Sequence, residues 1–308
     1  MIYNNVLEAI GHTPLIRLNK MTGPDDAEVL VKFEAVNIGG SIKTRTAYNM
    51  IHEAEKQGLI NADTIIVEPT SGNQGIGLAL VGAVRGYKVI IVMPDSVSLE
   101  RRKLVEQYGA EVILVKDEGD IGKCIENCLA TALDMAARDE NIYIPQQFTN
   151  PNNNQAHKLT TAREILEQAG KPLHGFCSGI GTGGSISGIG EVLRESYPDI
   201  LIWAVEPEHA AILSGHTIGT HVQMGIGDGL IPDNLNQKIY DDLCIITDDE
   251  AVRTAKDLAR REGLLCGISS GTNVAAALRM ARKLGAGKTV VTLLPDTGER
   301  YFSTPLFD

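Results

Sequence analysis

The sequence predicts an α/β protein built from two doubly wound domains whose sheets are mostly parallel. Short β-branched runs alternate with polar turns and amphipathic stretches, and three runs start at residues 64, 88 and 111, which lie 24 and 23 residues apart. This is the spacing of strand–helix–strand units. The runs are almost continuously apolar, as in KVIIVMP and EVILV, which is typical of parallel strands that are buried on both faces.

The same pattern resumes after the polar stretch 146–155 and predicts a second sheet. Its strand candidates are the segments HGFCSGI (174–180), LIWAVEP (201–207) and TVVTLLP (289–295). Between the last two, Thr247 and Glu250 form a capping box at the start of a helix that ends at Gly263. We expect this helix to belong to the scaffold and not to a site.

Composition and charge argue against several classes of partner. Lys and Arg number 28 against 39 Asp and Glu, a net charge of −11, which argues against binding to nucleic acid or to an anionic membrane surface. No apolar run reaches the roughly 18 residues that cross a bilayer, and the first residues lack the basic and apolar blocks of a signal peptide, so we expect a cytoplasmic protein. The 5 cysteines have no paired C-x-x-C spacing, so we expect free thiols and no structural metal.

Lys43 is the first candidate for chemistry. It follows a flexible turn in the segment NIGGSIKTR (37–45) and precedes a helical stretch at 46–56. An amine near the N-terminus of a helix, in a dry site, is easier to deprotonate and can form a Schiff base with a carbonyl cofactor. The alternative for a lone lysine is a solvated position in a loop. Three further segments favour the first interpretation.

The segment PTSGNQG (69–75) follows the strand at 64–67 and opens a helical stretch at 76–84. Ligands of parallel sheets collect at the carboxyl ends of the strands. Hydroxyls, an amide and backbone N–H groups at a helix N-terminus suit a carboxylate. The alternative is an ordinary tight turn that is capped by Thr70 or Ser71.

The segment GTGGS (181–185) lies between the strand candidate at 174–180 and a helix that starts near Ile186. Its three glycines let the backbone wrap around an oxyanion, and its two hydroxyls add donors, so it resembles a phosphate site. It has neither the Gly-Lys-Ser/Thr of a Walker loop nor the context of a G-x-G-x-x-G fingerprint. Nucleotide or nicotinamide binding is therefore the weaker alternative.

Ser269 lies in the segment GISSG (267–271), between the helix that ends at Gly263 and another that begins near Thr272. A serine hydroxyl can donate a hydrogen bond to a neutral ring nitrogen. Taken alone, this segment is typical of a helix N-cap. Together with a lysine, a phosphate site and a carboxylate site, it completes the contacts that pyridoxal 5'-phosphate needs.

These four segments, in this order, resemble those of the cysteine synthase and cystathionine β-synthase family, the fold-type-II pyridoxal-phosphate enzymes, from about residue 5 to the end of the chain. Six further stretches carry the resemblance: GHTPLIRL (11–18), QQFTNPNN (146–153), HKLTTAREI (157–165), GIGDGLIP (225–232), EGLLCG (262–267) and GERYFST (298–304). The resemblance implies a smaller mobile domain at 36–147, a larger cofactor-binding domain formed by 1–35 and 148–308, and a homodimer.

The resemblance also implies roles for individual residues. Lys43 would hold the cofactor as a Schiff base and move the α-proton of the substrate, Asn73 would bind the ring hydroxyl, and Ser269 would meet the pyridine nitrogen. The phosphate contacts would come from Gly181, Thr182, Gly183, Gly184 and Ser185. The substrate carboxylate would be bound by Thr70, Ser71 and Gln147 as the smaller domain closes.

Two departures from the family pattern bear on substrate choice. Gln74 stands where the family commonly has Thr, so one hydroxyl contact to the substrate carboxylate becomes a longer amide. Asp228 stands where cysteine synthases usually have a small residue and cystathionine β-synthases an aromatic one. A carboxylate there would act as a general base on water or a thiol, or would repel an anionic group. The alternative is a surface carboxylate in a glycine-rich turn.

The sequence therefore predicts a pyridoxal-phosphate enzyme of β-replacement or β-elimination on serine- or cysteine-type amino acids, which acts through an aminoacrylate and moves sulfide into or out of L-cysteine. One alternative is an L-cysteine lyase that releases hydrogen sulfide, with Asp228 activating water or a thiol. Another is the use of homocysteine, as in cystathionine β-synthases. Two rivals lie outside this class: a weakly catalytic binding module that docks the tail of a serine acetyltransferase, and a nucleotide-dependent α/β enzyme.

Overall fold

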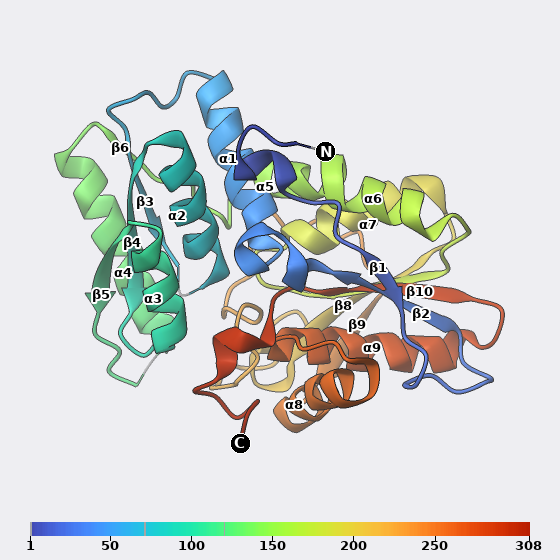
Figure 1. The fold of residues 1–308 in the computed structure, drawn as a ribbon. Coiled ribbons are helices and arrows are strands. Elements are labelled where there is room, and N and C mark those ends of the chain that lie inside the picture. Colours follow the sequence, from blue (N-terminus) through green and yellow to red (C-terminus); the bar gives the residue numbers. More distant parts are fainter. Residues whose placement is uncertain (1, 71, 120) are drawn as a thin grey trace.

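The computed structural model describes residues 2–70, 72–119 and 121–308, and these residues form two mostly parallel sheets with helices on both faces (Figure 1). The predicted α/β class is confirmed. The larger sheet has the order β1-β2-β10-β7-β8-β9, and every neighbouring pair is parallel except β1 and β2. Its strands are β1 (Leu15–Arg17), β2 (Glu28–Phe33), β7 (Gly175–Gly179), β8 (Leu201–Pro207), β9 (Asp242–Ile246) and β10 (Thr289–Leu294).

The smaller sheet has the order β5-β4-β3-β6, and all of its neighbouring strands are parallel. Its strands are β3 (Ile65–Pro69), β4 (Lys88–Pro94), β5 (Glu111–Val115) and β6 (Ile142–Tyr143). These strands all lie inside the smaller domain that the sequence predicts at 36–147. The boundary itself stays a prediction.

The helices cover both faces of each sheet. They are α1 (Lys43–Lys56), α2 (Asn73–Arg85), α3 (Leu99–Gln107), α4 (Ile121–Arg138), α5 (Asn152–Ala156), α6 (Ala162–Ala169), α7 (Gly184–Ser196), α8 (Asp248–Asp257) and α9 (Ile268–Leu284). On the smaller sheet, α1, α2 and α3 pack with Ile66, whereas α4 packs with its neighbour Val67 on the opposite face. On the larger sheet, α8 and α9 cover one face and α6 and α7 the other. Successive strand residues point to opposite faces, which is why these strands are apolar throughout.

Four helices begin earlier than the sequence predicts. α1 starts at Lys43 and not at 46, and α2 starts at Asn73 and not at 76. α7 starts at Gly184 and α9 at Ile268, a few residues before the predicted starts near 186 and 272. The first turn of a helix leaves its N–H groups without intrahelical partners and needs no apolar side chain. Polar and glycine-rich residues that resemble a loop therefore form these first turns.

Other predicted features are present. The 5 cysteines are free and buried, and the side chain of Thr247 caps α8 by accepting a hydrogen bond from the N–H of Glu250.

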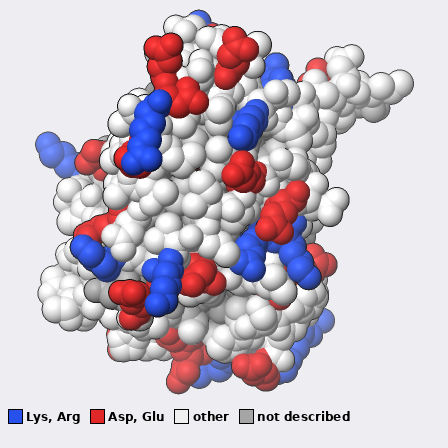
Figure 2. Space-filling view, turned by 90° about the vertical axis from the view of Figure 1, so that its left-hand side faces the viewer, with Lys and Arg blue, Asp and Glu red and all other residues white. Residues whose placement is uncertain are grey.

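Within the described ranges, no group of three or more His, Cys, Asp and Glu side chains is arranged to hold a metal ion. None of the described helices is both long and apolar enough to pass through a membrane. Figure 2 shows acidic and basic side chains interspersed over one face of the molecule.

Candidate active site

One pocket collects residues from all four predicted segments, at the carboxyl ends of strands from both sheets. The predicted site residues that line it are Lys43, Thr70, Asn73, Gln74, Gln147, Gly181, Thr182, Gly183, Ser185, Asp228 and Ser269. Gly184 lies in the same loop, as the first residue of α7. Ser71 lies outside the described residues. Segments that are up to 226 residues apart, from Lys43 to Ser269, thus meet at one place (269 − 43 = 226).

Lys43 is the first residue of α1 and lines the pocket. Burial lowers the pKa of its amine, and the carboxylates of Asp228 and Asp296 oppose that shift. A lysine with a lowered pKa loses its proton more readily and becomes a better nucleophile and base. Its predicted chemistry is therefore compatible with its surroundings.

Asp228 lines the same pocket and is partly exposed. It is carried by a turn in which Gly227 and Gly229 have φ values of 69° and 80°, a left-handed conformation that favours glycine. Burial raises the pKa of Asp228, while nearby Lys43 and Arg101 are among the cationic groups that lower it. A partly desolvated carboxylate beside an amine is well suited to exchange protons during a reaction.

The loop from Gly181 to Ser185 forms a tight cradle at the start of α7. A Cβ atom on Gly184 would lie 2.0 Å from Oδ1 of Asn153, and one on Gly183, where φ is 77°, would lie 2.8 Å from the backbone of Leu235. Only glycine therefore fits these two positions. The N–H groups of the first turn of α7 have no intrahelical partners and suit a phosphate.

Two hydroxyls of this loop form hydrogen bonds with buried side chains of neighbouring elements. Nδ2 of Asn153 donates to Oγ1 of Thr182 at 2.9 Å, and Oγ of Ser185 lies 3.2 Å from Nε2 of His157. Burial is the largest cause of the lowered pKa of His157, and Lys43 and Arg45 lower it further. His157 is therefore neutral, and it supports Ser185 without adding charge to the phosphate site.

Gln74 presents a free donor to the pocket. Its side chain is 1% exposed, and its Oε1 accepts a hydrogen bond from Oγ1 of Thr46 at 2.8 Å. Its Nε2 is buried and has no hydrogen-bond partner among the described residues. A buried amide donor without a partner is costly unless a ligand supplies the acceptor. This donor, together with the glycine cradle, fits a site for a phosphate-bearing cofactor and a carboxylate-bearing substrate.

Asn73 and Ser269 face the pocket from the first turns of α2 and α9. The N-cap of α2 is Gly72 and not Thr70 or Ser71, whereas the N-cap of α9 is Gly267, within the segment 267–271 that is typical of an N-cap. The Asn73 side chain is oriented by two groups, since its Nδ2 donates to Oδ2 of Asp296 at 2.7 Å and its Oδ1 accepts from Arg300.

Asp296, Arg300 and Tyr301 support the site, and no local sequence pattern predicts this role. The hydroxyl of Tyr301 donates to Oδ2 of Asp296 at 2.7 Å and accepts from Nη2 of Arg101 at 3.1 Å. Arg300 and Tyr301 lie in the stretch GERYFST, which carried the family resemblance but suggested no role. Their proximity to Asn73 is the signal that only the structure supplies.

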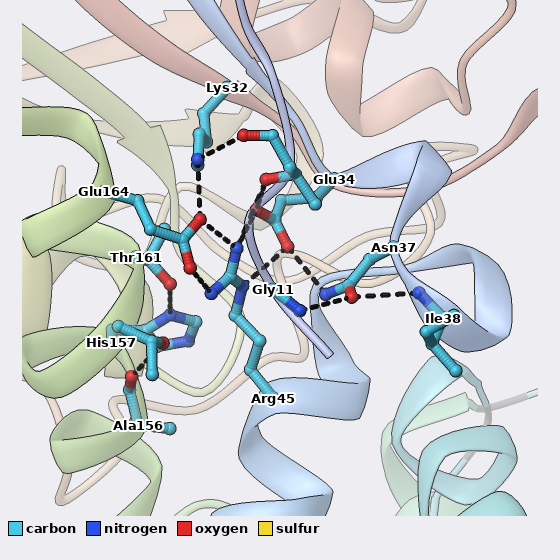
Figure 3. A network of polar contacts seen from close by, with 12 residues as sticks. Gly11, Lys32, Glu34, Asn37, Ile38, Arg45, Ala156, His157, Thr161 and Glu164 are labelled. Carbon is cyan, nitrogen blue, oxygen red and sulfur yellow. Dashed lines mark hydrogen bonds and ion pairs between the residues drawn. The ribbon is translucent and has the colours of Figure 1, made fainter. Parts of the chain in front are cut away.

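A buried ionic network anchors α1 two residues beyond Lys43 (Figure 3). Arg45 donates two hydrogen bonds to Glu34, at 2.9 and 2.8 Å, and two to Glu164, at 2.6 and 2.7 Å. Lys32 also pairs with Glu164 at 2.7 Å. These contacts join α1 to β2 and α6, and they hold the start of the helix that carries Lys43.

A lowered-pKa lysine, a glycine cradle for a phosphate and a donor-lined carboxylate site together define an enzyme that uses pyridoxal phosphate. Comparison with known proteins supports this class, because residues 6–296 match the family described as pyridoxal-phosphate dependent enzyme. The chain is 45% identical over 306 residues to a cysteine synthase of Staphylococcus aureus, covering 99% of this chain and 97% of that protein. It is 46% identical over 309 residues to a probable cysteine synthase of Bacillus subtilis, covering 99% and 98%.

Solved structures agree. A hydrogen sulfide-producing enzyme from Fusobacterium nucleatum is 42% identical and superposes with a TM-score of 0.92 over 97% of this chain and 100% of that chain. An O-acetylserine dependent cystathionine beta-synthase from Helicobacter pylori is 36% identical, with a TM-score of 0.94 over 100% of both chains. The chain belongs to the cysteine synthase family of pyridoxal-phosphate enzymes. The predicted family, fold and cofactor are confirmed.

Proposed function

We propose that this enzyme releases sulfide from L-cysteine and that water or a second thiol takes the place of the sulfur. The reaction is a pyridoxal-phosphate-dependent β-replacement, the class that its family supports. The observation that carries the proposed direction is the position of Asp228, whose carboxylate shares the pocket with Lys43. A carboxylate there repels incoming hydrosulfide, which is an anion, but attracts the proton of a neutral nucleophile.

The cofactor would be held by the glycine-rich loop at the start of α7 and by one side chain from the first turn of each of α2 and α9. Gly181, Thr182, Gly183, Gly184 and Ser185 would bind its phosphate, Asn73 its ring hydroxyl and Ser269 its ring nitrogen. When bound, pyridoxal phosphate supplies a carbonyl that joins the amino group and a conjugated ring that accepts electrons. Lys43 would anchor it and then carry the α-proton of the substrate, which its lowered pKa favours.

The substrate carboxylate would be bound by donors at the ends of β3 and at the start of α2. Thr70, Gln74 and Gln147 line the pocket, and they are proposed for this role together with Ser71. The unpartnered Nε2 of Gln74 is the strongest support, because a carboxylate oxygen would satisfy it. Movement of the domain at 36–147 over this group would exclude water.

Asp228 would act in the second half of the reaction. The Cβ–S bond of L-cysteine breaks and sulfur leaves as hydrosulfide, while the α-proton passes to Lys43. An O–H of water or an S–H of a thiol then adds at the β-carbon, and its proton passes to Asp228. Lys43 then returns its proton to the α-carbon, and the proton on Asp228 passes to the hydrosulfide, so that hydrogen sulfide is released. With water the product is serine, and with a thiol it is a thioether.

Synthesis of cysteine from an O-activated serine and sulfide is the second candidate, and the cysteine synthases at 45% and 46% identity favour it. Use of homocysteine is a third, supported by the 36% identity to a cystathionine beta-synthase. The first test therefore incubates the purified holoenzyme with L-cysteine alone, and assays sulfide and amino-acid products together. Parallel incubations contain O-acetylserine with sulfide, and L-cysteine with homocysteine.

The variant Asp228→Asn keeps the size of the side chain and removes its basicity. Sulfide release from L-cysteine should fall by about 100-fold or more, the usual contribution of a general base, and cysteine synthesis should fall far less. Asp233→Asn, which changes an exposed carboxylate outside the pocket, is the matched control and should leave both rates unchanged. Sulfide release by Asp228→Asn at the rate of the unmodified enzyme would reject the role of Asp228. Cysteine synthesis without sulfide release in the unmodified enzyme would establish the second candidate.

The proposed setting is a cytoplasmic homodimer. The 5 free and buried thiols support a reducing compartment, and exposed apolar side chains such as Leu159, 64% exposed, are available to a second copy. The side chains that are proposed to donate hydrogen bonds to the substrate carboxylate would also bind the C-terminal carboxylate of a serine acetyltransferase tail. Cell fractionation, light scattering and displacement of a tail peptide by substrate test these three points.

A further inference from the structure

Glu68 holds a sharp turn of the chain next to the pocket. It is the second-last residue of β3 and is 1% exposed. Its Oε2 accepts the backbone N–H of Gln146 and its Oε1 accepts the N–H of Gln147, both at 2.9 Å. Each carboxylate oxygen thus accepts one of two consecutive backbone N–H groups. These two N–H groups lie where the chain leaves the smaller sheet after β6.

The turn that Glu68 holds is strained. Gln146 has a φ of 58°, a left-handed conformation that a residue with a side chain rarely adopts. The two hydrogen bonds that Glu68 accepts favour this conformation, because both N–H groups then point at one side chain. The carbonyl of Gln146 also accepts the N–H groups of Thr149 and Asn150, at 3.1 and 3.0 Å, so Glu68 is one of several groups that hold the turn.

The peptide of Gln147 is also held from the opposite side, by the larger domain. Its carbonyl accepts from Nδ2 of Asn153 at 2.7 Å and from Nδ2 of Asn234 at 2.8 Å. The same Nδ2 of Asn153 donates to Thr182 in the phosphate cradle. Gln147 is therefore held from two sides, with its N–H bound to Glu68 of β3 and its carbonyl bound to Asn153 of α5 and to Asn234 in a loop.

We propose that Glu68 is a positioning residue that sets Gln147 in the pocket and so determines how tightly the substrate carboxylate is bound. This rests on the proposed role of Gln147 as a carboxylate ligand. The end of β3 would then control both halves of the carboxylate site. It carries Thr70 directly, and it fixes Gln147 through Glu68, although Gln147 lies 79 residues further along the chain.

The variant Glu68→Gln tests the proposal, because its amide keeps the shape but places an N–H₂ against one of the two backbone N–H groups. Glu206 offers a matched control. It occupies the same Val-Glu-Pro sequence at the end of β8, is 4% exposed, and accepts the N–H groups of Leu213 and Ser214 at 2.8 and 3.1 Å. Its Oε2 also accepts the hydroxyl of Ser214 at 2.7 Å. Glu206→Gln therefore disturbs a comparable pair of backbone hydrogen bonds on a strand end that does not hold Gln147.

The probe is L-alanine, which binds as an amino acid but has no β-leaving group. Its Kd is measured from the change in cofactor absorbance of the holoenzyme. Glu68→Gln should raise this Kd by about 10-fold, which equals about 1.4 kcal/mol, and should raise KM for the reacting amino acid with little change in kcat. Glu206→Gln should leave the Kd unchanged. The affinity for L-alanine does not depend on whether sulfide is released, so the proposed function can fail while this proposal stands.

A double-mutant cycle shows whether Glu68 acts through Gln147. In a Gln147→Ala background, Glu68→Gln should weaken L-alanine binding no further. An unchanged Kd in Glu68→Gln, an equal loss in Glu206→Gln, or a full additional loss in the Gln147→Ala background would each overturn the proposal. If Glu68→Gln does not fold, Glu68→Asp replaces it, and a Kd equal to that of the unmodified enzyme would overturn the proposal equally.

Discussion

The variant Arg45→Met removes the central cation of the buried network at the start of α1 (Figure 3). Arg45 and Glu34 are 2% and 0% exposed, and four hydrogen bonds join Arg45 to Glu34 and Glu164. The variant retains Lys32, which pairs with Glu164 at 2.7 Å in the unmodified protein. The remaining hydrogen bonds to Glu34 in the described part of the chain come from the neutral donors Thr13 and Asn37, at 2.6 and 3.0 Å.

Leaving one partner of a buried ion pair without its counter-charge typically costs about 3–5 kcal/mol. The entropy of unfolding is about 2.1 cal/mol/K per residue, so 308 residues correspond to roughly 0.65 kcal/mol/K. The expected fall in Tm is therefore roughly 5–8 °C. Methionine preserves the apolar contacts of the arginine stem, so the loss reports mainly on the charge.

Differential scanning calorimetry of the holoenzyme at pH 7 measures this shift. The control is Arg138→Met, because Arg138 pairs with Asp134 at 2.7 Å on the surface of α4, where the two side chains are 76% and 56% exposed. An exposed pair contributes less than about 1 kcal/mol, so the control should lose no more than about 1.5 °C. If Arg45→Met loses no more than Arg138→Met, the network does not anchor α1 as described.

Three further predictions concern pH and the cofactor. The hydrogen-bonded Arg45 holds the pKa of Glu164 at about 2, below its ordinary value of 4.5. The ionised carboxylate therefore stabilises the fold above pH 4.5, and this contribution to the free energy of unfolding falls as the pH drops towards about 2. Urea unfolding should show this fall in the unmodified protein and not in Glu164→Gln. Burial raises the pKa of Glu68 to about 7, and the titratable group that faces it is Tyr143 of β6. KM for the amino acid should therefore fall as the pH rises through about 7, and the pH profile of Glu68→Gln should lack this ionisation. Gly184→Ala forces its Cβ against Asn153, 2.0 Å away, so equilibrium dialysis should show weaker binding of pyridoxal phosphate, and an unchanged affinity would contradict the cradle.

Local patterns were sufficient for the fold class and for most of the candidate site. The spacing of apolar runs follows from the period of strand–helix–strand units, and the structure has strands at all six predicted positions. Asn73 and Gln74 were expected near a ligand because their segment follows a strand end, whereas Lys43 and Ser269 were expected there because each lies at the start of a helix. Their individual roles came from the family resemblance. Helix starts were predicted two to four residues too late, because a first turn needs no apolar side chain.

The supporting residues that the sequence did not reveal form hydrogen bonds with site residues that are far away along the chain. Glu68 holds Gln147, and Asp296 holds Asn73, through contacts between residues that are 79 and 223 positions apart. A buried carboxylate at a strand end has the same local sequence whether or not it supports a site, as the Val-Glu-Pro segments at Glu68 and Glu206 illustrate. Their partners differ only because different chain segments pack against them.

The sequence by itself determined that this chain is an α/β enzyme with a lysine, a phosphate cradle and a carboxylate loop, because short-range spacing sets strands, helices and the loops between them. Only the tertiary structure decided that Asp228 lines the same pocket as Lys43. The physical reason is that burial and electrostatic proximity depend on which distant segments meet, and these two properties decide what a carboxylate can do.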